Sequence, residues 1–128
     1  MNDGHLAATY NLALIYKNGM GVKKDYNKAF ELFKRSDEGE YINGTNMLGY
    51  CYSNGVRTDV DKKMALKLYQ KAASLGNIEA QYNLAFMYEN GKGIERDMDQ
   101  AIYWYEKSAR SGCIRALFKL NDLLRINQ

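Results

Sequence analysis

The sequence repeats itself with a period of 36 residues, and this repetition restricts the fold more than any other feature. The stretches YKNGMGV, YSNGVRT and YENGKGI begin at Tyr16, Tyr52 and Tyr88, each 36 residues after the one before. The match extends on both sides of these stretches. The aligned sets are Leu12, Leu48, Leu84 and Leu120; Ala13, Gly49 and Ala85; Asp25, Asp61 and Asp97; Ala29, Ala65 and Ala101; and Phe33, Tyr69 and Tyr105. Such a period indicates stacked copies of one supersecondary unit.

Each repeat is expected to form two helices. In the third copy, Ala80, Leu84 and Tyr88 recur at helical spacing and form one apolar face. Gly91 follows, and glycine commonly ends a helix in a left-handed conformation. Asp97 stands where an N-cap would begin the second helix. The helices expected in this way are 5–18, 25–37, 41–54, 61–75, 77–90, 97–111 and 113–126.

A single helix pair cannot bury its apolar face, whereas stacked pairs share one continuous core. The absence of proline agrees with a helical chain, because proline breaks helix interiors. No apolar run approaches the ~18–20 residues that cross a bilayer, and the first residues lack the pattern of a signal peptide. The net charge of +3 is too small to indicate a nucleic-acid partner.

The chain resembles the Sel-1-like repeat family, a relative of the tetratricopeptide repeats. The resemblance lies in the pattern A-x-x-x-L-[AG]-x-x-Y-x-x-G-x-G-[VI], followed by an acidic helix start and A-x-x-x-[FY]-x-x-[AS]-A. It is carried by ATYNLALIYKNGMGV, GTNMLGYCYSNGVRT and AQYNLAFMYENGKGI with the helices after them. The fold class implied is all-α: a right-handed α/α superhelical solenoid of antiparallel helix pairs, about seven helices and no strands. We expect one repeat domain over 1–128, with units at about 5–40, 41–76 and 77–112 and a half-unit at 113–128.

The sequence departs from the pattern in three places. Arg57 stands where the other loops have Gly21 and Gly93, so a left-handed backbone there would be strained unless the loop differs. At the first junction Gly39 comes one place early and Gly44 replaces alanine, so we expect altered helix-end geometry. The chain also begins out of phase, and its fourth unit lacks a second helix. It is either a piece of a longer array or a natural short array; the first is favoured, because terminal units usually carry polar caps.

No pattern in the sequence supports catalytic, metal or phosphate chemistry. The Gly-Lys-Gly of YENGKGI follows a helix rather than a strand, and Lys92 aligns with Met20 and Val56, so the loop is interpreted as a helix stop. His5 is the only histidine, and no motif surrounds it with a nucleophile or an acid. We therefore expect no catalytic residue, no metal, no cofactor and no enzymatic activity. The alternative is a hydrolase-like enzyme, an activity attributed to some cysteine-rich relatives of the family.

Cys51 and Cys113 are expected to be free thiols. They lie on first helices two units apart, where neighbouring helices pack ~8–10 Å apart, whereas a disulfide needs Cα atoms within ~7 Å. Some bacterial members of the family have a disulfide within each unit, and this chain lacks that pattern. Free thiols favour a reducing compartment such as the cytoplasm.

The candidate binding residues lie on the outward face of each first helix. A rotation of about 100° per residue places Tyr82 and Phe86 away from the core face set by Ala80 and Leu84. The period aligns these positions into two rows: Tyr10, Asn46, Tyr82 and Phe118; and Leu14, Tyr50, Phe86 and Asp122. The family resemblance puts first helices on a concave surface, so these rows would line a groove. We predict a scaffold or adaptor that holds a partner protein or peptide there, with Asn46 bonding its backbone.

Two other interpretations of these rows stay open. The aromatic side chains could instead pack against a neighbouring first helix and be largely buried. The chain could also be a structural module that self-associates through its unfinished ends. Neither nucleic-acid binding nor membrane insertion is expected.

Overall fold

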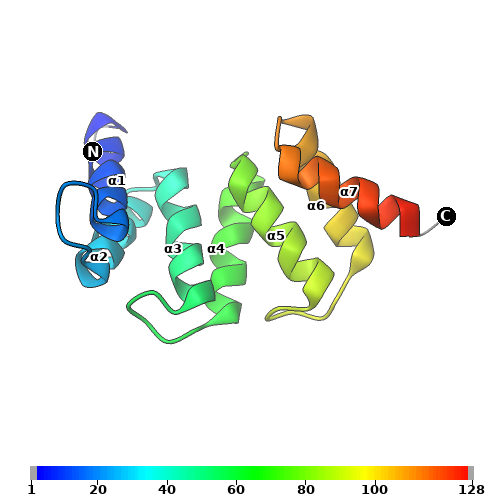
Figure 1. The fold of residues 1–128 in the computed structure, drawn as a ribbon, viewed down its shortest axis with the longest axis horizontal. Coiled ribbons are helices and arrows are strands. Elements are labelled where there is room, and N and C mark those ends of the chain that lie inside the picture. Colours follow the sequence, from blue (N-terminus) through cyan, green and yellow to red (C-terminus); the bar gives the residue numbers. More distant parts are fainter. Residues whose placement is uncertain (1–2, 127–128) are drawn as a thin grey trace. The chain divides into compact units, whose positions relative to one another are not determined.

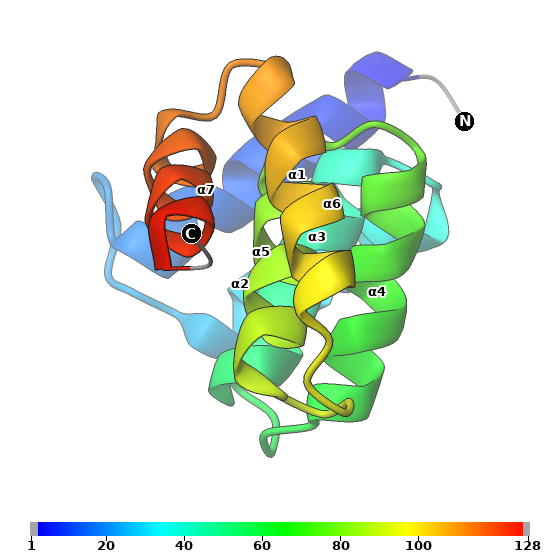
Figure 2. The ribbon, with the colours of Figure 1, turned by 90° about the vertical axis from the view of Figure 1, so that its right-hand side faces the viewer.

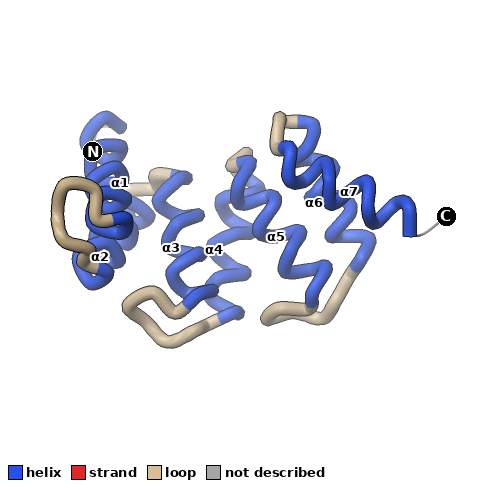
Figure 3. Tube along the Cα trace, in the orientation of Figure 1, coloured by secondary structure: helices blue, strands red, loops and turns tan. Residues whose placement is uncertain are grey.

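The computed structural model describes residues 3–126, which form seven helices and no strand (Figures 1 and 3). The helices are α1 Asp3–Asn18, α2 Tyr26–Glu38, α3 Ile42–Asn54, α4 Lys62–Ser74, α5 Ile78–Asn90, α6 Met98–Arg110 and α7 Ile114–Ile126. Every boundary lies within two residues of the helix expected from the sequence. The predicted all-α fold is thus confirmed for this part of the chain. The ends of the expected domain, residues 1–2 and 127–128, lie outside it.

The described residues fall into two compact units, 3–68 and 69–126, and the boundary between them in the sequence falls within α4. In the first unit α1 packs against α2 and α2 against α3; in the second, α5 packs against α6 and α6 against α7 (Figures 1 and 2). A first helix therefore packs on the second helix of its own repeat, and that second helix packs on the first helix of the next repeat. The single domain expected over 1–128 stays a prediction.

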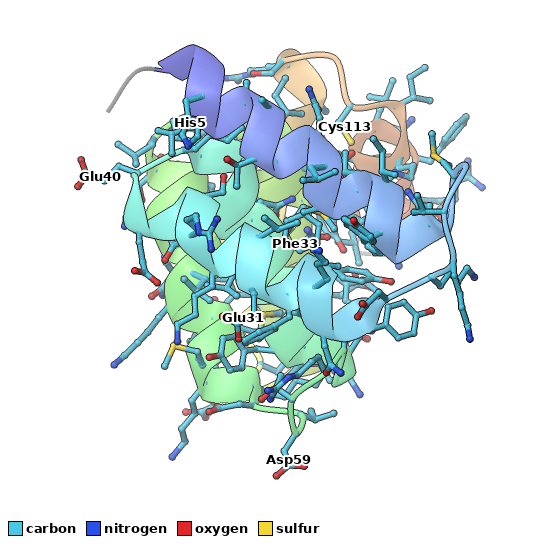
Figure 4. The ribbon with its side chains drawn as sticks, turned by 90° about the vertical axis from the view of Figure 1, so that its left-hand side faces the viewer. His5, Glu31, Phe33, Glu40, Asp59 and Cys113 are labelled. Carbon is cyan, nitrogen blue, oxygen red and sulfur yellow. The ribbon has the colours of Figure 1, made fainter. Side chains whose placement is uncertain are left out.

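The core of the first unit lies where α1, α2 and α3 meet. Ala13 of α1 and Ala29 of α2 are fully buried, and their small side chains allow the two helices to approach closely. Phe33 of α2 is fully buried; Figure 4 labels it on the side of α2 next to α1. Leu48 and Cys51 of α3 complete this cluster. Burying a side chain the size of Phe33 stabilises the fold by ~1.5–3 kcal/mol.

The second unit repeats this arrangement with α5, α6 and α7. Ala85 of α5 and Ala101 of α6 are fully buried in one cluster with Tyr105. Ala116 and Leu123 close the cluster from α7. The pair of buried alanines and the buried aromatic residue of the second helix thus occur at the same repeat positions in both units.

Aspartate caps begin the second helices, as the sequence predicts. The carboxylates of Asp25 and Asp97 accept hydrogen bonds from the backbone N–H groups three residues on, at 3.0 and 3.1 Å. Asp61 accepts one from Met64 N at 3.0 Å. Each bond satisfies a donor that the first turn of a helix leaves without a partner.

The loop between the two helices of each repeat contains a left-handed residue at a fixed position. Gly21 and Gly93 have φ of 78° and 76°, and Arg57 in the same position has φ of 68°. Of the two outcomes expected for Arg57, the structure shows the strained one, since the loop keeps its conformation. The Arg57 guanidinium lies 5.9 Å from the centroid of the Phe30 ring. This contact offsets part of the ~1–2 kcal/mol that a left-handed residue with a Cβ costs.

The altered helix-end geometry expected at the first junction is wrong. Glu40 adopts φ of 65°, in the position where Gly76 and Gly112 have φ of 98° and 107°. The backbone bonds of the helix end are also retained: Tyr41 N donates to Ser36 O at 3.0 Å, as its counterparts do at the later junctions. The glutamate accepts this strain while its side chain points into solvent (Figure 4). The helix end is therefore set by backbone hydrogen bonds and not by the presence of glycine.

Close packing explains both displaced glycines of this junction. A Cβ on Gly39 would lie 2.3 Å from Cδ2 of Leu6. A Cβ on Gly44 would lie 2.2 Å from Oγ of Ser36, so α2 and α3 approach too closely for alanine. Ser36 Oγ is buried without a hydrogen-bond partner among the described residues, whereas Ser108 Oγ, at the same repeat position, donates to Ile78 O at 3.0 Å.

These two serines give a matched pair of substitutions. Ser108→Ala should lower the free energy of unfolding by about 1 kcal/mol, because it removes a buried hydrogen bond. Ser36→Ala should leave stability unchanged or raise it by up to ~1 kcal/mol, because it removes a buried hydroxyl that has no partner. Urea unfolding of both variants measures the difference. Equal losses would contradict the assignment of these two hydroxyls.

Gly21 tests the backbone requirement of the loop alone, because nothing lies within 4 Å of a Cβ built on it. Gly21→Ala should lower the free energy of unfolding by about 1 kcal/mol through its left-handed backbone. Met20→Ala, at the exposed neighbouring position, should change it by less than about 0.5 kcal/mol. Thermal and urea unfolding would show whether the two variants separate in this order.

Candidate partner-binding face

In the first unit, Tyr10 of α1 is half-buried between two aromatic rings. Its ring centroid lies 5.9 Å from that of Phe33 in α2 and 5.5 Å from that of Tyr41 at the start of α3. The ring therefore packs on the second helix of its own repeat, where tilted aromatic pairs add ~0.5–1.5 kcal/mol to the effect of burial. Leu14, one turn further along α1, is half-buried against the same core.

The two predicted positions on α3 differ from each other. Asn46 is only 7 % exposed, so the exposed position expected for it is wrong. Its place among Thr45, Leu48 and Gly49, all of them buried, explains this. Tyr50 is half-buried, and the Nζ of Lys17 in α1 lies 5.0 Å from its ring centroid.

In the second unit, Tyr82 of α5 repeats the packing of Tyr10. Its ring meets that of Tyr105 in α6 edge to face, with centroids 5.6 Å apart. The Tyr105 hydroxyl donates to Oε1 of Glu89 at 2.6 Å. Burial, together with this hydrogen bond and the charge of Glu89, holds the pKa of Tyr105 well above its usual value. The pair is thus a fixed part of the α5–α6 packing.

Two basic side chains of α7 cover the aromatic residues of α5. Arg115 lies over Tyr82, with Cζ 4.5 Å from the ring centroid, and Lys119 lies over Phe86, with Nζ 5.5 Å from it. Each cation also meets an acid of α5. Arg115 Nη2 lies 2.7 Å from both carboxylate oxygens of Glu79, and Lys119 Nζ lies 3.5 Å from Glu89 Oε1. The hydrogen bond to Glu79 raises the pKa of Arg115.

Phe86, Phe118 and Asp122 are the predicted residues that face solvent. Phe86 is 40 % exposed and Phe118 of α7 is 65 % exposed, while Asp122 is exposed one turn further along. Phe118 occupies the same repeat position as Tyr10 and Tyr82, whose rings pack on a second helix. No second helix follows α7 within residues 3–126, so the Phe118 ring has no such cover.

The structure therefore divides the eight predicted residues. Phe86, Phe118 and Asp122 are exposed, Leu14 and Tyr50 are half-buried, Tyr10 and Tyr82 pack on their own second helices, and Asn46 is buried. A partner-binding role for the eight stays a prediction.

Sequence reasoning did not predict that cations lie over these rings. Lys17, Arg115 and Lys119 were not among the predicted residues, although one signal could have found Arg115. Glu79 and Arg115 lie 36 residues apart, at the same position of successive repeats. Opposite charges at one repeat position indicate a salt bridge between neighbouring first helices.

A shallow, mainly apolar depression of about 460 Å³ lies beside the Glu79–Arg115 pair. Ile78, Ser111, Cys113 and Ile114 contribute to its lining. The two charged groups in this lining are bonded to each other. Among residues 3–126 no three His, Cys, Asp or Glu side chains are grouped as a metal site would require. No helix in this part of the chain has the length and apolar character to cross a membrane.

The sequence model of one family, described as Sel1 repeat, matches residues 6–36, 43–77 and 78–113. The chain belongs to the Sel1 repeat family. No curated protein matches the chain. The predicted recognition is confirmed, and so is the fold class, since the structural neighbours are helical repeat solenoids of the same family.

Three solved structures illustrate this similarity. A Sel1 repeat protein from Oxalobacter formigenes is 32% identical over 93% of this chain and 90% of its own, with a TM-score of 0.81. The c5321 protective antigen of uropathogenic Escherichia coli, described as having an SLR fold, is 33% identical with a TM-score of 0.83. That match covers 88% of this chain but 24% of the antigen. Helicobacter pylori cysteine rich protein B is 25% identical over 91% of this chain and 90% of its own, with a TM-score of 0.73.

Unlike a cysteine-rich protein, this Sel1 repeat chain has two cysteines, and both are free thiols in the structure. Cys51 is fully buried, and burial raises its pKa to about 11, a rise that the Lys17 charge only partly offsets. Cys113 is half-buried at the start of α7.

The two thiols should therefore react at different rates with a thiolate-selective reagent at pH 8. We expect one fast reaction, at Cys113, and one slower by about 100-fold or more, at Cys51, because thiolate fraction and access are both reduced there. Absorbance of the released thiol follows both phases. Cys113→Ser should abolish the fast phase and Cys51→Ser should retain it; the reverse pattern would show that Cys51 is accessible.

Proposed function

We propose that this Sel1 repeat protein is a non-enzymatic scaffold that binds a partner protein or peptide through the outward faces of its first helices. Sel1 repeats are commonly protein–protein interaction modules and are in general non-catalytic. The observation that carries the proposal for this chain is an aromatic ring with a lysine over it, on the first helices of both units. The rings are Tyr50 and Phe86, and the lysines are Lys17 and Lys119.

Each ring–lysine pair offers two kinds of contact side by side. Phe86 is 40 % exposed, so an apolar side chain of a partner can pack on the ring that remains open. The ammonium groups of Lys17 and Lys119, 5.0 and 5.5 Å from their ring centroids, can attract a carboxylate at the same place. The partner that fits this chemistry is a peptide segment in which apolar and acidic residues alternate closely.

The energies favour the rings as the main contributors. Covering an aromatic side chain of this size contributes ~1.5–3 kcal/mol, whereas an exposed ion pair contributes only ~0–1 kcal/mol. Association also loses translational and rotational freedom, which offsets much of the gross gain. A few such contacts are consistent with dissociation constants of about 1 μM or weaker.

A peptide selection tests this proposal. Random peptides displayed on phage are selected on the folded chain, and the binding of selected peptides is measured by fluorescence anisotropy. The double variant Tyr50→Ala/Phe86→Ala should weaken binding by about tenfold or more, because it removes the candidate ring of each unit and the loss of a contacting aromatic side chain typically costs much of an interface's affinity. Circular dichroism and the melting temperature show whether the variant remains folded.

Tyr103→Ala is the matched control. Tyr103 is an exposed aromatic of α6, a second helix, and its removal should leave the affinity within about twofold of the original value. The proposal fails if no peptide is selected. It also fails if selected peptides bind the double variant as tightly as the unchanged chain.

A further inference from the structure

Two repeats have both of their helices within one unit: α1 with α2, and α5 with α6. In each of them the second helix covers one defined side of the first helix. In the α1–α2 pair, Ala13 meets the side that carries Ala29, and the Tyr10 ring lies 5.9 Å from Phe33. In the α5–α6 pair the corresponding contacts join Ala85 to the side of Ala101, and Tyr82 to Tyr105 at 5.6 Å. The repeat thus specifies what lies against this side of a first helix.

Among the described residues, no helix covers the same side of α7. We define the α7 open face as the exposed residues Ile114, Leu117, Phe118, Asn121, Leu124 and Arg125. Four of them are large and apolar, with exposures of 68 %, 47 %, 65 % and 44 % for Ile114, Leu117, Phe118 and Leu124. The opposite side of α7 is packed, because Ala116 and Leu123 belong to the buried cluster with residues of α6. Figure 2 shows α7 beside α6.

The aligned positions of α5 are covered. Leu117 aligns with Gln81, which is 3 % exposed, and Asn121 aligns with Ala85, which is fully buried. A stripe of four large apolar residues at helical spacing normally faces a core or a partner.

We propose that the α7 open face binds an amphipathic helix with the side-chain pattern of this chain's own second helices. That pattern is a small residue, an aromatic four positions later, and a small residue three positions after the aromatic. It is present three times in the chain: Ala29, Phe33 and Ser36; Ala65, Tyr69 and Ala72; Ala101, Tyr105 and Ser108. The aromatic ring of the bound helix packs on Phe118, as Tyr105 packs on Tyr82.

Charge indicates a further property of the bound helix. Arg115 and Lys119 of α7 already pair with Glu79 and Glu89 of α5, so Arg125 is the charged residue of the α7 open face. Arg125 occupies the repeat position of Glu89, which accepts a hydrogen bond from the aromatic residue of its second helix. With arginine in that place, an acidic residue of the partner forms the equivalent contact. The partner is therefore an acidic amphipathic helix, and two α7 faces set against each other would bring like charges together.

This surface goes beyond the proposed function and does not depend on it. The ring–lysine pairs involve Tyr50 and Phe86, whereas the α7 open face relies on Leu117 and Leu124. Phe118 is the one predicted groove residue that also belongs to the open face, so it is left unchanged in the test.

The probe is a fluorescein-labelled peptide with the sequence of residues 97–112, which contains one complete second helix. A second peptide carries the changes K107E and R110E, and a third carries Tyr105→Ser. Anisotropy titrations with the full chain should show saturable binding of the first peptide. The acidic peptide should bind about threefold or more tightly, and the Tyr105→Ser peptide about tenfold or more weakly.

Variants of the chain locate the bound helix. Leu117→Lys/Leu124→Lys should weaken peptide binding by about tenfold or more, whereas Leu75→Lys, at an exposed leucine outside α7, should leave it unchanged. Phe86→Ala should also leave it unchanged, which separates this surface from the proposed groove. Absence of binding, or equal binding to the α7 variant, would overturn the proposal. So would sedimentation analysis showing that the chain dimerises and that the α7 variant is monomeric, because the occupant would then be a second copy.

Discussion

The close approach of first and second helices through paired small residues is the constraint on which each unit depends. Ala13 with Ala29, and Ala85 with Ala101, bring the helix backbones near enough for one aromatic residue, Phe33 or Tyr105, to fill the space beside them. The same contact fixes Tyr10 and Tyr82, because their rings rest on that aromatic residue. Helix packing therefore decides which residues of the outward face remain available to a partner.

The sequence predicted the features that depend on local backbone requirements. Two such features are the aspartate caps at Asp25, Asp61 and Asp97 and the left-handed position after each first helix. Both depend on groups within a few residues of each other, so the three repeats of a single sequence are enough to recognise them. Glu40 shows the limit of that reasoning. Residue type suggested a different helix end there, but the backbone hydrogen bonds around it retain the conformation of the other junctions.

The candidate face was less predictable, because it depends on side chains that meet across helices. A helical projection gives the direction of Asn46 but not the depth of its surroundings, and the structure buries it. The positions of Lys17 and Lys119 over Tyr50 and Phe86 require the distance between neighbouring first helices, which periodicity does not supply. Phe118 and Asp122 are exposed, as their aligned positions indicated, whereas the extent of the apolar side of α7 depends on packing between helices that periodicity does not supply.

The lysines that lie over Tyr50 and Phe86 have a consequence for solubility. An ammonium group above an exposed ring brings its hydration shell to an apolar surface, so two such surfaces cannot meet without stripping water from both cations. A lysine placed over a ring therefore disfavours association of two copies of the chain through that ring. A carboxylate brought to the same place would compensate the lost hydration, whereas another lysine would not.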